Sequence, residues 1–245
     1  MSAPLHTRGP LSLLASLTAV MLLPVSEAQT AAPVSAAQQL QVALEKTPKD
    51  NPPAPPAFPF DAETARKYQR QYAEWSGLPL ELIDSAGIEF LLVPPGEFQM
   101  GSPEDEPGHS ESSYDEFLHP VRLTRPFYLS RSETTVEQFG RFVQSTGFLT
   151  DGEKNGGGNA HDDHAVWKHR PGTSWRRPGF AGPFELSDHQ PIVHVSHFDA
   201  RMFCRWLRDS DPAPDCLPRA RYGLPTEAQW EWACRAGAGS RFSWG

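Results

Sequence analysis

Three segments of the chain place a helix-capping sequence in front of apolar residues at helical spacing. In each, Ser or Thr is followed three residues later by Glu, Asp or Gln, as in a capping box. The pairs are Thr134 and Glu137, Ser196 and Asp199, and Thr226 and Gln229. The apolar faces that follow are Val136, Phe139, Phe142 and Val143; Ala200, Phe203 and Leu207; and Trp230, Ala233 and Cys234. The pattern predicts three amphipathic helices, the first ending at Gly147 and the third at Gly237.

A fourth helix and several strands are predicted around these three. Asp61 is the expected N-cap of a helix to about Trp75, with Tyr68, Tyr72 and Trp75 on one face. Residues 89–102 predict a hairpin, two strands joined by a Pro-Pro-Gly turn. Further strands are predicted at 119–123, 126–129 and 192–195, whereas the Gly- and Pro-rich residues 155–184 predict an ordered, irregular loop that lines a groove. Together these elements predict an α+β fold.

The first 28 residues have the pattern of a secretory signal peptide. Arg8 supplies positive charge, Leu11–Leu23 a short apolar stretch, and Ser26 and Ala28 the small residues of a cleavage site after Ala28. A membrane anchor is the alternative, but the apolar run is shorter than the ~20 residues needed to span a bilayer. We therefore expect a secreted or periplasmic protein with no membrane span after the signal peptide is removed.

Composition divides the rest of the chain into three parts. Residues 29–60 are rich in Ala and Gln and then in Pro, which predicts an extended linker. Residues 61–87 would form a short docking helix and a connector, and residues 88–245 the domain proper. The net charge of −8, without a Lys/Arg cluster, argues against a nucleic-acid partner.

Candidate chemistry is sparse. His161 with His164, and His194 with His197, could each form half of a metal site, but neither pair has an evident third ligand, and His is more often a surface or hydrogen-bonded residue. The acidic residues 104–116 predict a solvated loop, because the ligand spacing of a known calcium loop is missing. No nucleophile, phosphate-loop or dinucleotide motif occurs. The sequence thus assigns no catalytic residue and no metal ligand.

Several motifs, in the same order, resemble those of the formylglycine-generating enzyme (sulfatase-modifying factor) family. They are Pro-x-Gly-x-Phe-x-Met-Gly-Ser at 94–102, Trp-Arg-x-Pro at 175–178, and Leu-Pro-Thr-Glu-Ala-x-Trp-Glu at 224–231 followed by Ala-Cys-Arg. This chain departs from the family at Gly223 (usually Arg), Gln229 (usually Glu) and His197 (usually Trp). The resemblance implies an irregular α+β fold, a distant variant of the C-type-lectin type. It also implies that residues 88–245 form the N-terminal half of that domain, truncated on its C-terminal side.

The resemblance also implies a function. The family oxidises a cysteine of a sulfatase-type polypeptide to formylglycine with O2, using copper(I) held by a cysteine pair in the C-terminal half, where the calcium sites also lie. No position of this chain matches that pair, so we expect the chain itself to carry no catalytic residue and no cofactor. Trp175 and Arg176 are expected at the substrate groove, and Cys204 and Cys234 at positions of structural disulfides. The alternative is a non-catalytic module of the same fold that binds a peptide or a glycan.

Overall fold

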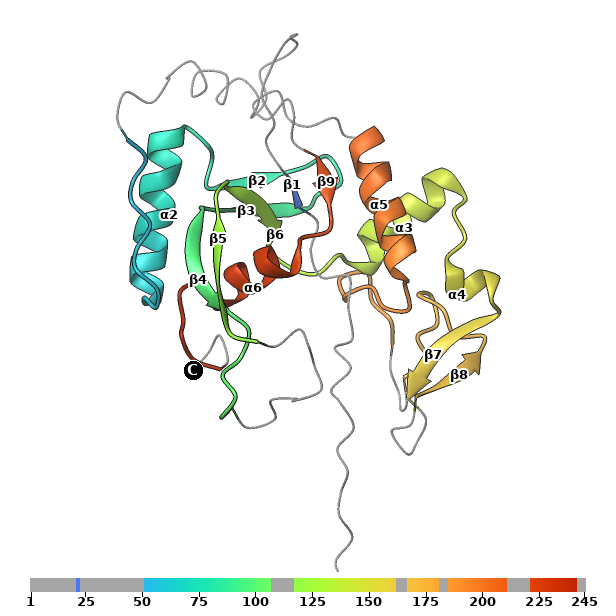
Figure 1. Ribbon diagram of the computed structural model, residues 1–245. Coiled ribbons are helices and arrows are strands. Elements are labelled where there is room, and N and C mark those ends of the chain that lie inside the picture. Colours follow the sequence, from blue (N-terminus) through green and yellow to red (C-terminus); the bar gives the residue numbers. More distant parts are fainter. Residues whose placement is uncertain are drawn as a thin grey trace, which may run out of the picture.

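The computed structural model describes residues 21–22, 51–106, 117–161, 167–180, 185–210 and 221–241. Its elements are β1 (Met21–Leu22), α2 (Ala62–Ser76), β2 (Glu81–Ile83), β3 (Glu89–Val93), β4 (Gly96–Met100), β5 (His119–Leu123), β6 (Phe127–Ser130), α3 (Val136–Thr146), α4 (Asp151–Lys154), β7 (Gly157–His161), β8 (Trp167–Pro171), α5 (His197–Ser210), β9 (Tyr222–Gly223) and α6 (Glu227–Arg235). Figure 1 shows the strands β2, β3 and β6 centrally, with α2 on one side and α3, α4, α5 and the β7–β8 pair on the other. The predicted α+β fold is confirmed.

The main sheet has five strands in the order β2-β3-β6-β1-β9, and each neighbouring pair is antiparallel. β1 belongs to the predicted signal peptide, yet Met21 lies opposite both Leu129 of β6 and Gly223 of β9. The remaining residues of that segment, and residues 29–50 of the predicted linker, lie outside the described residues.

The predicted hairpin at residues 89–102 is wrong. Both strands are present, but β3 pairs with β2 and β6, whereas β4 pairs with β5 in a separate two-stranded sheet. Pro94 and Pro95 lie between them and have no N–H with which to continue a ladder. Their carbonyls instead accept hydrogen bonds from the Trp232 indole at 3.0 Å and the Tyr68 hydroxyl at 3.0 Å. The chain therefore crosses from one sheet to the other at this point.

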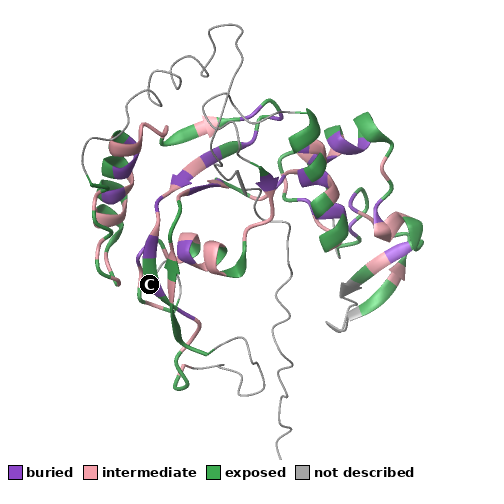
Figure 2. Ribbon diagram, turned by 45° about the horizontal axis from the view of Figure 1, so that its top comes forward, coloured by how far each residue is buried: buried purple, intermediate pink, exposed green. Residues whose placement is uncertain are grey.

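The larger core lies between the main sheet and the helices, where Figure 2 shows buried positions along α3 and α5. The predicted faces of these helices are confirmed, with Phe139 and Phe203 fully buried. On the other side, α2 begins at its predicted cap Asp61 and buries Tyr68 and Tyr72. The aromatic stripe of this helix is thus a packing face.

A second, smaller core places α6 against β4. Its buried residues are Phe98, Met100, Phe127 and Trp232. Of the predicted face of α6, only Ala233 packs on this core. The prediction is wrong for the other two residues: Trp230 is 39% exposed and Cys234 is exposed, whereas Trp232 is 5% exposed. The absence of a side chain at Gly96 leaves room for the Trp232 ring, since a Cβ added at Gly96 would lie 2.6 Å from its Cη2 atom.

The Pro-rich residues 51–60, predicted as part of a linker, pack on this second core. Phe58 lies 6.4 Å from Phe98 and Phe60 lies 6.0 Å from Trp232, centroid to centroid. The Phe60 amide also donates to the Gly237 carbonyl at 2.8 Å. An extended, proline-rich backbone leaves its side chains free to dock, so composition alone did not separate a spacer from a packed segment.

Three local predictions also need correction. The capping box of α3 is formed by Thr135 and Gln138, one residue later than predicted. Residues 155–184 include the β7–β8 hairpin, so they are not an irregular loop throughout. Residues 192–195 form no strand, although Ile192 is fully buried. In the last two cases tertiary contacts overrode the local pattern.

Candidate functional site

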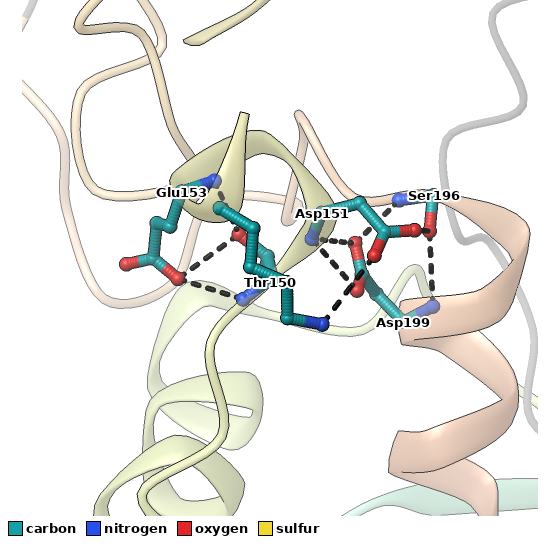
Figure 3. A network of polar contacts seen from close by, with 6 residues as sticks. Thr150, Asp151, Glu153, Ser196 and Asp199 are labelled. Atoms are coloured by element: carbon teal, nitrogen blue, oxygen red, sulfur yellow. Dashed lines mark hydrogen bonds and ion pairs between the residues drawn. The ribbon is translucent and has the colours of Figure 1, made fainter. Parts of the chain in front are cut away.

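A polar junction connects the N-terminal ends of α4 and α5 (Figure 3). Asp199 of α5 accepts hydrogen bonds from the Asp151 amide at 3.1 Å and the Ser196 amide at 2.8 Å. Ser196 Oγ donates to Asp151 Oδ2 at 2.6 Å and accepts from the Asp199 amide at 3.1 Å. The predicted capping box of Ser196 and Asp199 is therefore present, and the same carboxylate also caps α4.

The buried carboxyl group of Asp199 connects two helices through its hydrogen bonds. Asp199 is fully buried, and loss of solvation raises the pKa of its carboxyl group, while the hydrogen bonds from Ser196 and Asp151 act in the opposite direction. At the N-terminus of α4 itself, Thr150 and Glu153 form a second capping box, in which the Thr150 amide donates to Glu153 Oε2 at 2.9 Å. These carboxylates are used in positioning two helices.

The segment carrying Trp175 and Arg176 packs beside this junction. Trp175 is 2% exposed and its ring centroid lies 5.4 Å from that of Phe139. Its indole N–H is buried without a hydrogen-bond partner among the described residues. Arg176 stacks on the indole, with its guanidinium carbon 3.9 Å from the ring centroid, and its Nε lies 3.8 Å from Glu153 Oε1.

The groove predicted from these two residues remains a prediction. The structure brings them together, but it places them differently with respect to solvent. Trp175 is a core residue that anchors the loop, whereas the Arg176 side chain is 56% exposed and presents a cation at the surface. Of the two side chains, only that of Arg176 is therefore open to solvent.

The candidate histidines at 194 and 197 have separate environments. A ring nitrogen of His194 lies 2.7 Å from the Pro178 carbonyl oxygen, which anchors the loop after Trp175, and His194 itself has a φ of 56°. His197 is exposed at the first position of α5. Among the described residues, no group of three or more His, Cys, Asp or Glu side chains is arranged to hold a metal. His164, the predicted partner of His161, lies outside the described residues.

The two described cysteines differ in environment. Cys204 is buried in the larger core, and burial raises the pKa of its thiol to about 12. Cys234 is exposed on α6, and both thiols are free. Their assignment to structural disulfides stays a prediction, and Cys216 lies outside the described residues.

One buried ion pair was not predicted from the sequence. Glu231 and Arg235 of α6 pair at 2.7 Å with both side chains mostly buried. Glu231 accepts from the Gly101 amide at 3.0 Å, and Arg235 donates to the Gly101 carbonyl at 2.8 Å. The i, i+4 spacing of Glu and Arg signals a helix-surface pair. Nothing in that spacing indicates that the pair holds the residue after β4.

Comparisons with known proteins agree with this architecture. The family model described as "Sulfatase-modifying factor enzyme 1-like domain" matches residues 83–245. The formylglycine-generating enzyme of Streptomyces coelicolor is 36% identical over 174 residues, which are 63% of this chain and 50% of that relative. The enzyme of the same name from Mus musculus is 32% identical over 203 residues, which are 74% of this chain and 49% of that relative. The chain therefore spans about half the length of these curated relatives.

Other similar proteins are more varied. The inactive C-alpha-formylglycine-generating enzyme 2 of Bos taurus is 29% identical, over 69% of this chain and 56% of its own length. Among solved structures, PvdO from Pseudomonas aeruginosa matches with a TM-score of 0.49 and 23% identity, over 66% of this chain and 53% of that one. No helix in the described part of the chain is long and apolar enough to cross a membrane. With the family model matching well over half of its residues, the chain belongs to the family of formylglycine-generating enzymes and their relatives, the sulfatase-modifying factors.

Proposed function

We propose that this chain serves in an exported protein that oxidises a cysteine of a sulfatase-type polypeptide to formylglycine. The observation that carries the proposal is the match of residues 83–245 to the sulfatase-modifying factor model, together with relatives named formylglycine-generating enzymes. Export is supported by the signal-peptide pattern of residues 1–28. The location that follows is secreted or periplasmic.

The described residues do not fit the copper(I) and calcium that the family resemblance implies. Copper(I) prefers thiolates, and a thiolate is favoured by an electropositive, partly exposed site. Cys204 is instead buried with a raised pKa, and Cys234 is exposed on a different helix. The Asp151–Asp199 carboxylates are occupied by amide and hydroxyl donors. We therefore derive no step through a metal from these residues.

The part of the activity that this chain's own residues support is substrate binding. Arg176 is held by the Trp175 ring beneath it and by Glu153 beside it, so its guanidinium is preorganised while more than half exposed. A guanidinium presented in this way binds carboxylate or carbonyl oxygens of a polypeptide. Trp175 would act indirectly, by fixing the position of Arg176.

A non-catalytic peptide- or glycan-binding module is the second candidate. It is favoured by the similarity to two mammalian relatives whose names describe them as inactive. In that case Arg176 would contribute to binding and no oxidation would follow. The two candidates differ in product formation.

The test is an assay of the complete protein that contains these residues, with a cysteine-containing sulfatase-type peptide, copper and O2, and with an aldehyde-trapping probe and mass spectrometry as readouts. Aldehyde formation is the expected result, and Arg176→Ala should raise KM about tenfold, equivalent to about 1.4 kcal/mol of binding. Arg122→Ala is the matched control, because Arg122 is an exposed, ion-paired arginine on β5. Binding without aldehyde would favour the non-catalytic module, and neither binding nor aldehyde would overturn both.

A further inference from the structure

Two cationic side chains flank the short helix α4, and both are held in the same way. The guanidinium carbon of Arg176 lies 3.9 Å from the Trp175 ring centroid. The Nζ atom of Lys154 lies over two phenylalanine rings, 5.0 Å from the centroid of Phe148 and 5.8 Å from that of Phe198. Aromatic faces attract cations through the ring quadrupole. Each cation therefore rests on an aromatic surface.

The ion pairs that these two cations make on α4 are long. Lys154 Nζ lies 3.5 Å from Asp151 Oδ1, and Arg176 Nε lies 3.8 Å from Glu153 Oε1. Charge-assisted hydrogen bonds of this kind are usually about 2.7–2.9 Å long. In both pairs the carboxylate is held through its other oxygen: Asp151 Oδ2 accepts from Ser196 Oγ at 2.6 Å, and Glu153 Oε2 accepts from the N-cap amide of α4 at 2.9 Å. Both cations therefore keep donor capacity for a further acceptor.

The two cations are open to solvent on either side of α4. The side chain of Lys154 is 46% exposed, and that of Arg176 is 56% exposed. Figure 3 shows their carboxylate partners, Asp151 and Glu153, pointing away from each other on α4. A helix with its side chains is about 10–12 Å across. Two acceptor groups that reach both cations must therefore lie about that far apart.

Exposed apolar side chains accompany Lys154. Phe198, whose ring lies under the ammonium group, is 51% exposed, and Leu149, which follows Phe148 in the chain, is 58% exposed. Surfaces that bind one another are complementary in charge, so a cation beside apolar groups fits a partner that presents an anion beside an apolar group. Nucleic acids and anionic lipid surfaces are disfavoured by the net charge of −8. The partner that fits this surface is an acidic polypeptide segment.

We propose that Lys154, Leu149 and Phe198 form a second subsite for the polypeptide that binds at Arg176, and that this subsite selects an acidic residue accompanied by an apolar one. An extended chain advances about 3.3 Å per residue, so 10–12 Å corresponds to about three or four residues. Side chains two and four residues apart share one face of an extended chain. The ligand is therefore an extended segment with carboxylates at positions i and i+4 and an apolar side chain at i+2. This proposal rests on the substrate binding proposed above and specifies the class of substrate.

The experiment measures binding of a labelled peptide, Gly-Glu-Ser-Leu-Ser-Glu-Gly, to the complete protein that contains these residues, by fluorescence anisotropy. Lys154→Gln should weaken binding about fivefold to tenfold, whereas Lys154→Arg, which keeps the cation, should retain it. Lys67→Gln is the matched control, because Lys67 is an exposed lysine of α2, which Figure 1 shows on the other side of the main sheet. An unchanged affinity in Lys154→Gln, or an equal loss in Lys67→Gln, would overturn the subsite.

Peptide variants identify the group that each cation meets. Glutamine in place of one glutamate should abolish the effect of Lys154→Gln, and glutamine in place of the other should abolish the effect of Arg176→Ala. Phe198→Ser should weaken binding of the parent peptide but not of the peptide in which serine replaces leucine. If Lys154→Gln weakened all the peptides equally, its effect would be structural and the proposal would be wrong.

The subsite and the proposed function can fail separately, because the peptide contains no cysteine and its binding does not depend on oxidation. Coupling between Lys154 and one glutamate, without aldehyde formation from a cysteine-containing peptide, would leave the subsite in place and refute the oxidation. Aldehyde formation without that coupling would refute the subsite and leave the proposed function unaffected.

Discussion

The contact between Gly96 and Trp232 provides a sharp test of how β4 and α6 are joined. A Cβ at position 96 would lie 2.6 Å from Trp232 Cη2, whereas carbon atoms in favourable contact lie about 3.5–4.0 Å apart. Gly96→Ala therefore requires a displacement of about 1 Å. The ring has little freedom to move, because its Nε1 donates to the Pro94 carbonyl at 3.0 Å and it packs against the rings of Phe98 and Phe60.

The expected loss of stability follows from these restraints. Overpacking of a filled core costs about 1–3 kcal/mol, and weakening a buried hydrogen bond costs a further ~0.5–1.5 kcal/mol. We expect Gly96→Ala to lower the free energy of unfolding by about 2–3 kcal/mol. In a chain of this size that corresponds to a decrease in Tm of about 4–12 °C. The measurement is thermal denaturation of the full-length protein by circular dichroism.

Two further variants identify the cause. Gly223→Ala is the matched control, because no atom of the described residues lies within 4 Å of the added Cβ, and its effect should stay within about 0.5 kcal/mol. Trp232→Phe removes the benzo ring that contains Cη2, so adding Gly96→Ala to it should cost much less than Gly96→Ala alone. An equal loss in both backgrounds, or a neutral Gly96→Ala, would refute the proposed contact.

Three other outcomes are expected. Thr226→Ala removes the acceptor of the Gln229 amide and should lower the free energy of unfolding by about 1 kcal/mol. Thr226→Ser should retain the cap. Equal denaturation midpoints for Thr226→Ala and the parent would show that Thr226 contributes nothing. Burial raises the pKa of Asp199, so its contribution to stability is present below the unfolded-state pKa and is lost as the pH rises through the folded-state pKa. Stability should fall with rising pH across that window, and an unchanged slope in Asp199→Asn would contradict this. Mass spectrometry of the exported protein should find Gln29 at its N-terminus, and an intact Met1 would contradict cleavage after Ala28.

Local signals predicted the helices better than the faces they bury. The caps at Asp61, Ser196 and Thr226 were correct because a capping hydrogen bond spans only three residues of sequence. The cap of α3 was placed one residue too early, because Thr134 and Thr135 are equivalent acceptors in sequence. The completed box at Gln138 was visible only in the structure.

In the candidate site, too, local features were predicted from the sequence and long-range contacts were not. The sequence identified Trp175 and Arg176 as a distinctive pair, but burial of one and exposure of the other depend on the packing of α3 behind the indole. Asp199 was predicted as the cap of its own helix, and its bond to the Asp151 amide, 48 residues away, could not be read from spacing. Contacts between distant residues carry no local pattern.

Family membership, the α+β class and the positions of most helices and strands could all be predicted from the sequence. These depend on caps, periodicity and motif wording, all of which are encoded within a few consecutive residues. Three features depend on contacts between distant residues: β3 and β4 belong to different sheets, Trp232 rather than Trp230 is buried, and residues 21–22 pair with β6 in the main sheet. Strand pairing and burial each require a second surface, so a short stretch of sequence does not specify them. The partner surface in each case comes from a distant part of the chain.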